Sequence, residues 1–136
     1  MNFPVTGKMS WFGGPLDYGV APDEGLALIE PDDLKDYGRF GYLFLPAQPP
    51  ETTGLARRLN PSCFYLAMRW NYAQFPREVL RRSKVTLKAN GRSVCAAPVD
   101  WGPNDDTGRI ADLSPGAAAA LGLVTDDVVT CNLCLP

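Results

Sequence analysis

Thirteen prolines spread along 136 residues limit the possible folds of this chain more than any other feature of its sequence. A proline inside a helix removes a backbone hydrogen bond and clashes with the preceding turn, and sheets accept proline mainly at strand ends, edges and bulges. Thirteen glycines add further turn positions. We therefore expect short strands joined by many turns rather than long helices.

Length and composition predict a single domain covering residues 1–136. A chain of this length buries enough surface for one core, and 46% apolar with 21% charged residues is typical of a globular protein.

The charge balance and the missing residue types exclude several functions. A net charge of -2 gives no electrostatic case for binding nucleic acid. We interpret the densest basic cluster as a solvated face; it consists of Arg77, Arg81, Arg82 and Lys84. The chain has no histidine, which excludes Ser-His-Asp and Cys-His catalysis and histidine-based metal sites. We predict no metal and no cofactor.

Four cysteines remain, at positions 63, 95, 131 and 134. Cys131 and Cys134 have the spacing of a metal motif, but they lie in an apparent strand, where residues three apart point to opposite faces. Buried free thiols are the first expectation, one disulfide the second and a zinc site the third.

The first eight residues show neither a basic stretch nor an apolar stretch, so no signal peptide is predicted. No apolar run approaches the about 20 residues that span a bilayer. We expect synthesis in the cytoplasm and no membrane insertion.

In the first half of the chain, apolar runs predict short strands at 8–12, 24–29 and 41–45. The acidic segment 31–36 favours one helical turn, and the proline-rich segment 46–54 favours a loop.

The second half is more regular. Residues 63–70 are apolar and β-prone and predict a buried strand, and 76–82 predict a short helix. Asn90-Gly91 between the alternating runs 84–89 and 92–97 predicts a hairpin with a type I′ turn.

The C-terminal part is expected to be turn-rich over 98–109 and to end in a strand over 126–135. Ser114 and Pro115 predict the start of a short helix that stops at Gly122. The whole pattern favours an all-β fold with a short helix, a barrel of about six short strands.

Several motifs of the second half occur in a recognisable order. They are Asn-Gly-Arg-Ser-Val from position 90, Val-Asp-Trp-Gly-Pro from 99, Gly-Arg-Ile-Ala-Asp-Leu-Ser from 108, and a small-residue helix ending in Leu-Gly at 121–122. This order resembles the double-psi β-barrel of the rare lipoprotein A family, over about residues 63–133, with a fainter likeness at 8–12. Expansins and barwin-like proteins share that barrel.

The resemblance implies a six-stranded double-psi β-barrel in which residues 13–61 form a loop-rich N-terminal insertion. It also implies peptidoglycan binding and, in active family members, lytic transglycosylation.

Asp100 matches the family's catalytic aspartate. Cleavage of a glycosidic bond needs an acid for the leaving oxygen, and a transglycosylase attacks with the sugar's own 6-hydroxyl, so one carboxylate can serve as acid and then base. Trp101 beside it is expected to raise the pKa of the carboxyl by desolvation. The alternative role of Asp100 is to cap the turn before Gly102-Pro103 through backbone N–H groups.

Asp112 either faces the groove and contacts substrate or holds the loop before the Ser114 helix, and we favour the second role. Trp101 and Tyr72 are candidates for stacking on sugar rings, whereas Trp11 and Trp70 are expected to pack in the core or at its rim.

The chain departs from the family at two positions. Arg57 occupies the position of a family glutamate and Met68 that of a family histidine. Arginine cannot act as an acid or base near neutral pH, so we place Arg57 among the substrate-contacting residues. Glu24, in the insertion, is a candidate for the missing carboxylate.

Two functions follow as hypotheses. The first is a protein directed at peptidoglycan glycan strands, either lytic transglycosylase-like or a degenerate glycan binder. A phage tail or virion would bring such a protein to the cell wall without a signal peptide. The second is a non-catalytic structural or interaction module whose partners are virion or other assembly proteins.

Overall fold

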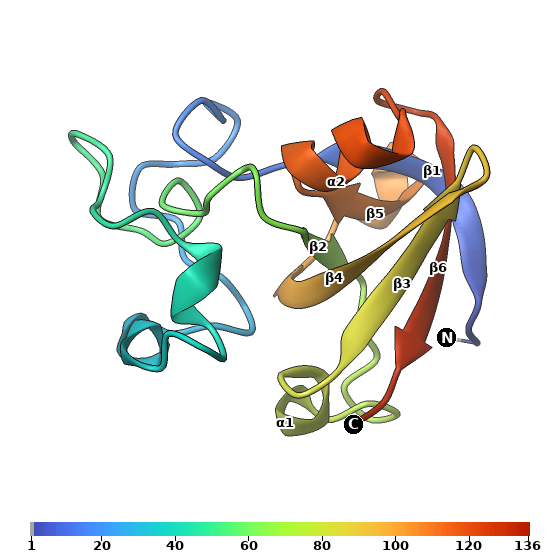
Figure 1. Cartoon of the computed structure of the whole chain (residues 1–136), viewed down its shortest axis with the longest axis horizontal. Coiled ribbons are helices and arrows are strands. Elements are labelled where there is room, and N and C mark those ends of the chain that lie inside the picture. Colours follow the sequence, from blue (N-terminus) through green and yellow to red (C-terminus); the bar gives the residue numbers. More distant parts are fainter. Residues whose placement is uncertain (1) are drawn as a thin grey trace.

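In a computed structural model, which describes residues 2–136, six strands close into a barrel at one end of the molecule (Figure 1). The strands are β1 (Val5–Trp11), β2 (Tyr65–Met68), β3 (Lys84–Ala89), β4 (Arg92–Trp101), β5 (Arg109–Leu113) and β6 (Val128–Cys134). Around the barrel their order is β1-β5-β2-β4-β3-β6. The pairs β1/β5 and β2/β4 are parallel, and the other four contacts are antiparallel.

The helices are short, as the prolines predicted. They are α1 (Arg77–Leu80) and α2 (Pro115–Leu121), with 3-10 turns η1 at Pro31–Lys35, η2 at Gly41–Leu43 and η3 at Asp105–Thr107. No helix within residues 2–136 has the length and apolar character needed to cross a membrane.

The barrel interior is filled by alternate side chains of the strands, as the period of two requires. The fully buried residues of the strands include Met9, Leu66, Met68, Val85, Leu87, Ala111, Leu113 and Cys131. The outward positions between them remain available for a surface site.

Local sequence signals specify two of these elements as expected. Asn90 and Gly91 both have positive φ, 53° and 72°, which confirms the hairpin turn between β3 and β4. The Ser114 hydroxyl accepts a hydrogen bond from the N–H of Ala117 at 3.1 Å, and Gly122 ends α2 with φ of 69°.

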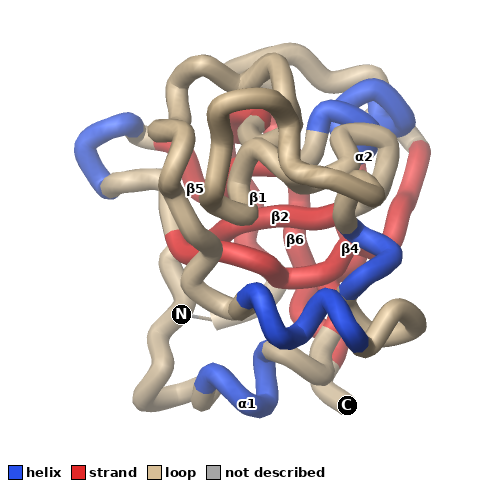
Figure 2. The backbone as a smooth tube through the Cα atoms, turned by 90° about the vertical axis from the view of Figure 1, so that its left-hand side faces the viewer, coloured by secondary structure: helices blue, strands red, loops and turns tan. Residues whose placement is uncertain are grey.

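Residues 13–61, which the family resemblance predicts to be an insertion and which we call the insertion below, form the loop-rich lobe beside the barrel, and Figure 2 views the molecule from that side. Its apolar side chains belong to the same core as those of the barrel; they include Leu28, Ile29, Phe40, Leu43, Leu55 and Leu59. The backbone joins the barrel directly where the N–H of Leu28 donates to the carbonyl of Val99 at 3.1 Å.

The strands predicted at 24–29 and 41–45 are wrong. Residues 24–29 form an irregular segment, and 41–43 form a 3-10 turn followed by an isolated bridge between Phe44 and Leu59. The apolar residues in both runs indicated buried side chains rather than strands. The backbone groups of these segments form single hydrogen bonds to other parts of the chain instead of strand ladders. The helical turn at 31–36 and the loop at 46–54 are confirmed.

Strand β4 continues through Trp101, although turns were expected from Pro98 onward. The strand accepts the proline because Pro98, the partner of Leu66, lies at the point where the β2/β4 register shifts. Strand β5 was not assigned from the sequence.

The basic cluster is a solvated face only in part: Arg82 and Lys84 are exposed, whereas Arg77 and Arg81 bond to the insertion. Arg81 is largely buried and pairs with Asp33 through contacts of 2.7 and 2.9 Å, with its guanidinium 4.6 Å from the Phe40 ring centroid. The Arg77 guanidinium donates to the carbonyl of Ala27 at 2.9 Å. These arginines therefore fasten the insertion to the segment around α1.

The four cysteines are free, and their burial differs. Cys131 is buried, Cys63 is half-buried, and Cys95 and Cys134 are exposed. The expectation of buried thiols is therefore correct for Cys131 only. Cys131 is buried and Cys134 is exposed, which agrees with the alternation of side chains between the two faces of strand β6.

Candidate functional site

The site is built from a row of four residues on neighbouring strands. Ser10 of β1 pairs with Asp112 of β5, Asp112 pairs with Ala67 of β2, and Ala67 pairs with Asp100 of β4. Residues paired in this way present their side chains to the same face of a sheet. Neighbouring strands are about 4.8 Å apart, so the Cα atoms of the two aspartates are about 10 Å apart with only the methyl group of Ala67 between them.

The carboxylate of Asp100 is held by the backbone. Its Oδ1 accepts hydrogen bonds from the N–H of Ala27 at 2.8 Å and from the N–H of Trp101 at 2.9 Å. Burial raises its pKa, both hydrogen bonds act in the opposite direction, and the nearby charge of Glu24 raises it further. Asp100 thus connects the insertion to β4, and its Oδ2 atom takes no part in these two hydrogen bonds.

Asp112 is in a different environment. Within residues 2–136 its carboxylate has no hydrogen-bond partner, and burial raises its pKa to about 6. Arg109 and Arg69 lower this pKa, whereas the charges of Asp100 and Asp17 raise it. Asp112 therefore retains a proton at a pH where an ordinary aspartate has lost it.

The electrostatic effect of Asp100 on Asp112 agrees with their placement on one face. Two neighbouring carboxyl groups with different surroundings are the usual basis for separate acid and base roles. Within the part of the chain that the structure describes, no backbone group hydrogen-bonds to the side chain of Asp112, so the loop-holding role that we favoured has no such bond behind it.

The insertion brings two further acidic residues toward this row. Asp17 is fixed by N–H groups of Gly13 and Gly19, at 2.7 and 3.0 Å, and it acts electrostatically on Asp112. Glu24 is exposed and acts on Asp100. The sequence signal for Asp17 is its position within a glycine-rich turn.

Two aromatic side chains lie near Asp100. Trp101 is 43% exposed, and its indole N–H donates to the carbonyl of Trp70 at 3.2 Å, so the ring is anchored while part of it faces solvent. Tyr72 is 40% exposed; burial and the charge of Asp100 raise its pKa, and Arg77 lowers it.

Trp70 is buried as expected and donates to the carbonyl of Asp100 at 2.9 Å. It therefore stabilises the end of β4 through this hydrogen bond and offers no exposed ring surface to a ligand.

Arg57 is not brought to the two aspartates. Its guanidinium donates to the carbonyl of Val20 at 3.1 and 2.6 Å and lies 5.5 Å from the ring centroid of Tyr18. It stabilises the first loop of the insertion. Met68 is fully buried in the barrel, so it has no access to the site.

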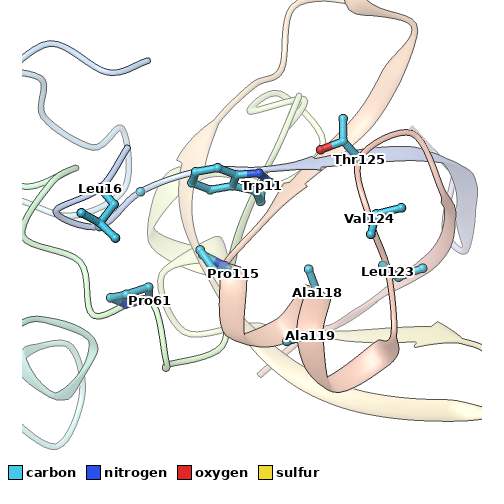
Figure 3. A pocket seen from close by; sticks show the side chains of 11 residues that line it. Trp11, Leu16, Pro61, Pro115, Ala118, Ala119, Leu123, Val124 and Thr125 are labelled. Carbon is cyan, nitrogen blue, oxygen red and sulfur yellow. The ribbon is translucent and has the colours of Figure 1, made fainter. Parts of the chain in front are cut away.

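A separate apolar cavity of about 550 Å³ lies between the end of β1, the insertion and α2 (Figure 3). Trp11, which is 44% exposed, lines one side, and Ala118, Leu123 and Val124 line the side of α2. Leu16 and Pro61 belong to the insertion side. The cavity contains neither Asp100 nor Asp112, so it is distinct from the acidic row.

No cluster of three or more potential metal ligands occurs in the part of the chain that the structure describes. No protein-family model matches the chain. No curated protein matches it either.

Proposed function

We propose that this protein acts on peptidoglycan glycan strands, by acid catalysis of the lytic transglycosylase type, from a double-psi β-barrel. The observation that carries the proposal is the pair of aspartates flanking Ala67, of which one is held by the backbone and the other is unpartnered with a pKa of about 6.

The barrel supports the double-psi assignment at the level of topology. It is closed, has six strands and contains two parallel pairs, β1/β5 and β2/β4, within an otherwise antiparallel order. The two family-like motifs with aspartates fall at the end of β4 and in β5, which are both neighbours of β2.

The different surroundings assign different roles. Protonated Asp112 donates its proton to the leaving oxygen as the bond to the anomeric carbon breaks. Asp100, ionised and fixed by two N–H groups, stabilises the positive charge that develops on the sugar. The sugar's 6-hydroxyl then bonds to the anomeric carbon and returns its proton to Asp112, which completes an acid and base cycle without water.

This proposal exchanges the roles first expected for the two aspartates. Asp100 was expected to be the acid. Burial raises the pKa of both carboxyl groups, but Asp100 has two backbone hydrogen bonds that act in the opposite direction, and Asp112 has no such bond within residues 2–136. The exposed faces of Trp101 and Tyr72 are suited to stacking on sugar rings beside the pair.

The test is digestion of purified bacterial sacculi, with released fragments analysed by mass spectrometry. Wild type is compared with Asp112→Asn and Asp100→Asn, and with Asp32→Asn as a matched control that removes an exposed carboxylate paired with Lys35. We expect anhydro-sugar ends from wild type and from the control, and none from Asp112→Asn.

Reducing ends instead of anhydro ends would mean that water attacks, and Glu24 or Asp100 would then be the residue to test as its base. The proposal would be overturned if the protein released no fragments and also failed to co-sediment with sacculi.

The apolar cavity favours a second candidate, an interaction module of a larger assembly such as a phage virion. Leu16 and Val124 at its edge are 76% and 70% exposed, and grouped apolar surface of this kind is typical of contact sites. This candidate predicts a stable complex with an assembly protein and unchanged sacculi.

A further inference from the structure

Two of the free cysteines open into one small cavity on the side of the barrel. Cys63 precedes β2 and Cys95 lies within β4, and both line a cavity of about 280 Å³ together with Tyr42 and Lys84. The glycan chemistry proposed above does not use either thiol.

The shared cavity and the nearby start of the β2/β4 register bring the two residues near each other. Tyr65 and Ala97 are partners in the parallel β2/β4 pair, and the N–H of Ala97 donates to the carbonyl of Phe64 at 3.0 Å. Two residues before these partners lie Cys95, within β4, and Cys63, in the bend that precedes β2, where its thiol donates to the carbonyl of Tyr42 at 3.4 Å. Parallel neighbours are about 4.8 Å apart, which is within the Cα separation of about 4.4–6.8 Å that a disulfide requires.

The other two cysteines are excluded as partners of Cys95. Cys131 is fully buried inside the barrel. Cys134 of β6 pairs with Lys84 of β3, and its thiol lies 3.5 Å from the hydroxyl of Thr86, the β3 partner of Cys95, so β3 lies between the two cysteines. Two strand spacings, about 10 Å, separate β6 from β4, which exceeds the reach of a disulfide.

We propose that Cys63 and Cys95 are a modification site, at which reaction with a disulfide such as oxidised glutathione forms an intramolecular Cys63–Cys95 disulfide. The exposed Cys95 thiolate attacks one sulfur of oxidised glutathione, and the first glutathione leaves as a thiolate. The Cys63 thiolate then attacks the Cys95 sulfur and releases the second glutathione. The protein loses two hydrogens, and glutathione disulfide is reduced to two thiols.

The order of these steps follows from exposure. Burial raises the pKa of the Cys63 thiol, and the thiolate is the reactive form, so Cys95 reacts first and Cys63 resolves the mixed disulfide. The product joins the segment between the insertion and β2 covalently to β4, the strand that carries Asp100 near its C-terminal end.

The test uses the folded full chain. After incubation with oxidised glutathione and blocking of free thiols, trypsin separates the candidates, because Cys63 lies in peptide 59–69, Cys95 in peptide 93–109, and the other two cysteines in peptide 110–136. We expect an intact mass lower by two hydrogens and a linked pair of peptides 59–69 and 93–109.

Cys134→Ser is the matched control and should give the same linked pair. Cys95→Ser should abolish it while circular dichroism remains that of wild type. A stable glutathione adduct on Cys95, a link from 93–109 to 110–136, a disulfide between two chains, or four unmodified thiols would each overturn the proposal. None of these results depends on glycan cleavage, so this inference and the proposed function fail separately.

Discussion

Replacement of Asp112 by asparagine should make the protein more stable at neutral pH. The pKa of Asp112 rises from an ordinary value of 3.8 to about 6 in the fold, because burial penalises its charged form. A shift of roughly two pKa units corresponds to about 3 kcal/mol, and solvent screening of this half-buried side chain reduces it to about 2 kcal/mol.

The sign follows from proton binding. Between about pH 4 and pH 6 the folded protein holds a proton on Asp112 that the unfolded chain has released, so the free energy of unfolding falls as pH rises through this window. Above about pH 6 the ionised carboxylate lowers the free energy of unfolding by a constant amount. Asparagine has nearly the same shape and no charge, so the substitution removes that cost.

Urea unfolding at two pH values measures the effect. At about pH 8 the midpoint of Asp112→Asn should exceed that of wild type by about 1 M, for a denaturant slope of about 2 kcal/mol per M, and near pH 3.5 the two midpoints should coincide. Asp32→Asn, on an exposed carboxylate, should match wild type at both pH values. A midpoint of Asp112→Asn that lies below that of wild type at pH 8, and less so at pH 3.5, would refute the reasoning, since it would show that the ionised carboxylate is stabilised in the fold.

Three further predictions concern the scaffold around the site. Asp33→Asn breaks the bidentate pair with Arg81; because the pKa of Asp33 is lowered to about 2, the variant should lose about 2 kcal/mol at pH 7 by urea unfolding, and the loss should shrink as pH falls from about 4 toward 2. Gly54→Ala places a methyl group against the backbone carbonyl of Glu24, so limited proteolysis should show a loosened insertion, whereas unchanged protection would contradict the close approach. Ser114→Ala removes the N-cap of α2 and should lower the free energy of unfolding by about 1 kcal/mol. An unchanged urea midpoint would show that the cap does not stabilise the fold.

The elements that the sequence predicted well are those whose signals are local. The type I′ turn needs positive φ at Asn90 and Gly91, and the limits of α2 need a capping hydroxyl at Ser114 and a left-handed residue at Gly122. Each of these requirements is met within a few residues of chain, so a single sequence suffices to find it.

The insertion could not be predicted in the same way. Its apolar runs at 24–29 and 41–45 have the composition of buried strands, yet their backbone groups bond singly to distant segments, for example Leu45 to Arg58 and Leu28 to Val99. Such contacts depend on tertiary structure rather than on periodicity. The same holds for Arg81, whose burial depends on Asp33 arriving from 48 positions earlier.

For the candidate site, the two aspartates could be named from the sequence, but their arrangement in space could not. Asp100 and Asp112 were both singled out from motifs, but their position on either side of Ala67 follows from a strand order that no local pattern encodes. Arg57 was assigned to the site from the family resemblance alone, and its hydrogen bonds to Val20 place it in the scaffold of the insertion.

The rate of fragment release from bacterial sacculi as a function of pH tests the central claim most directly, because it joins the chemistry to one carboxyl group. The account predicts that release by wild type is highest below about pH 6 and falls as Asp112 loses its proton, and that Asp112→Asn, although more stable, releases nothing at any pH. Release by Asp112→Asn at the wild-type rate, or a wild-type rate that does not change through pH 6, would contradict the assignment of Asp112 as the acid.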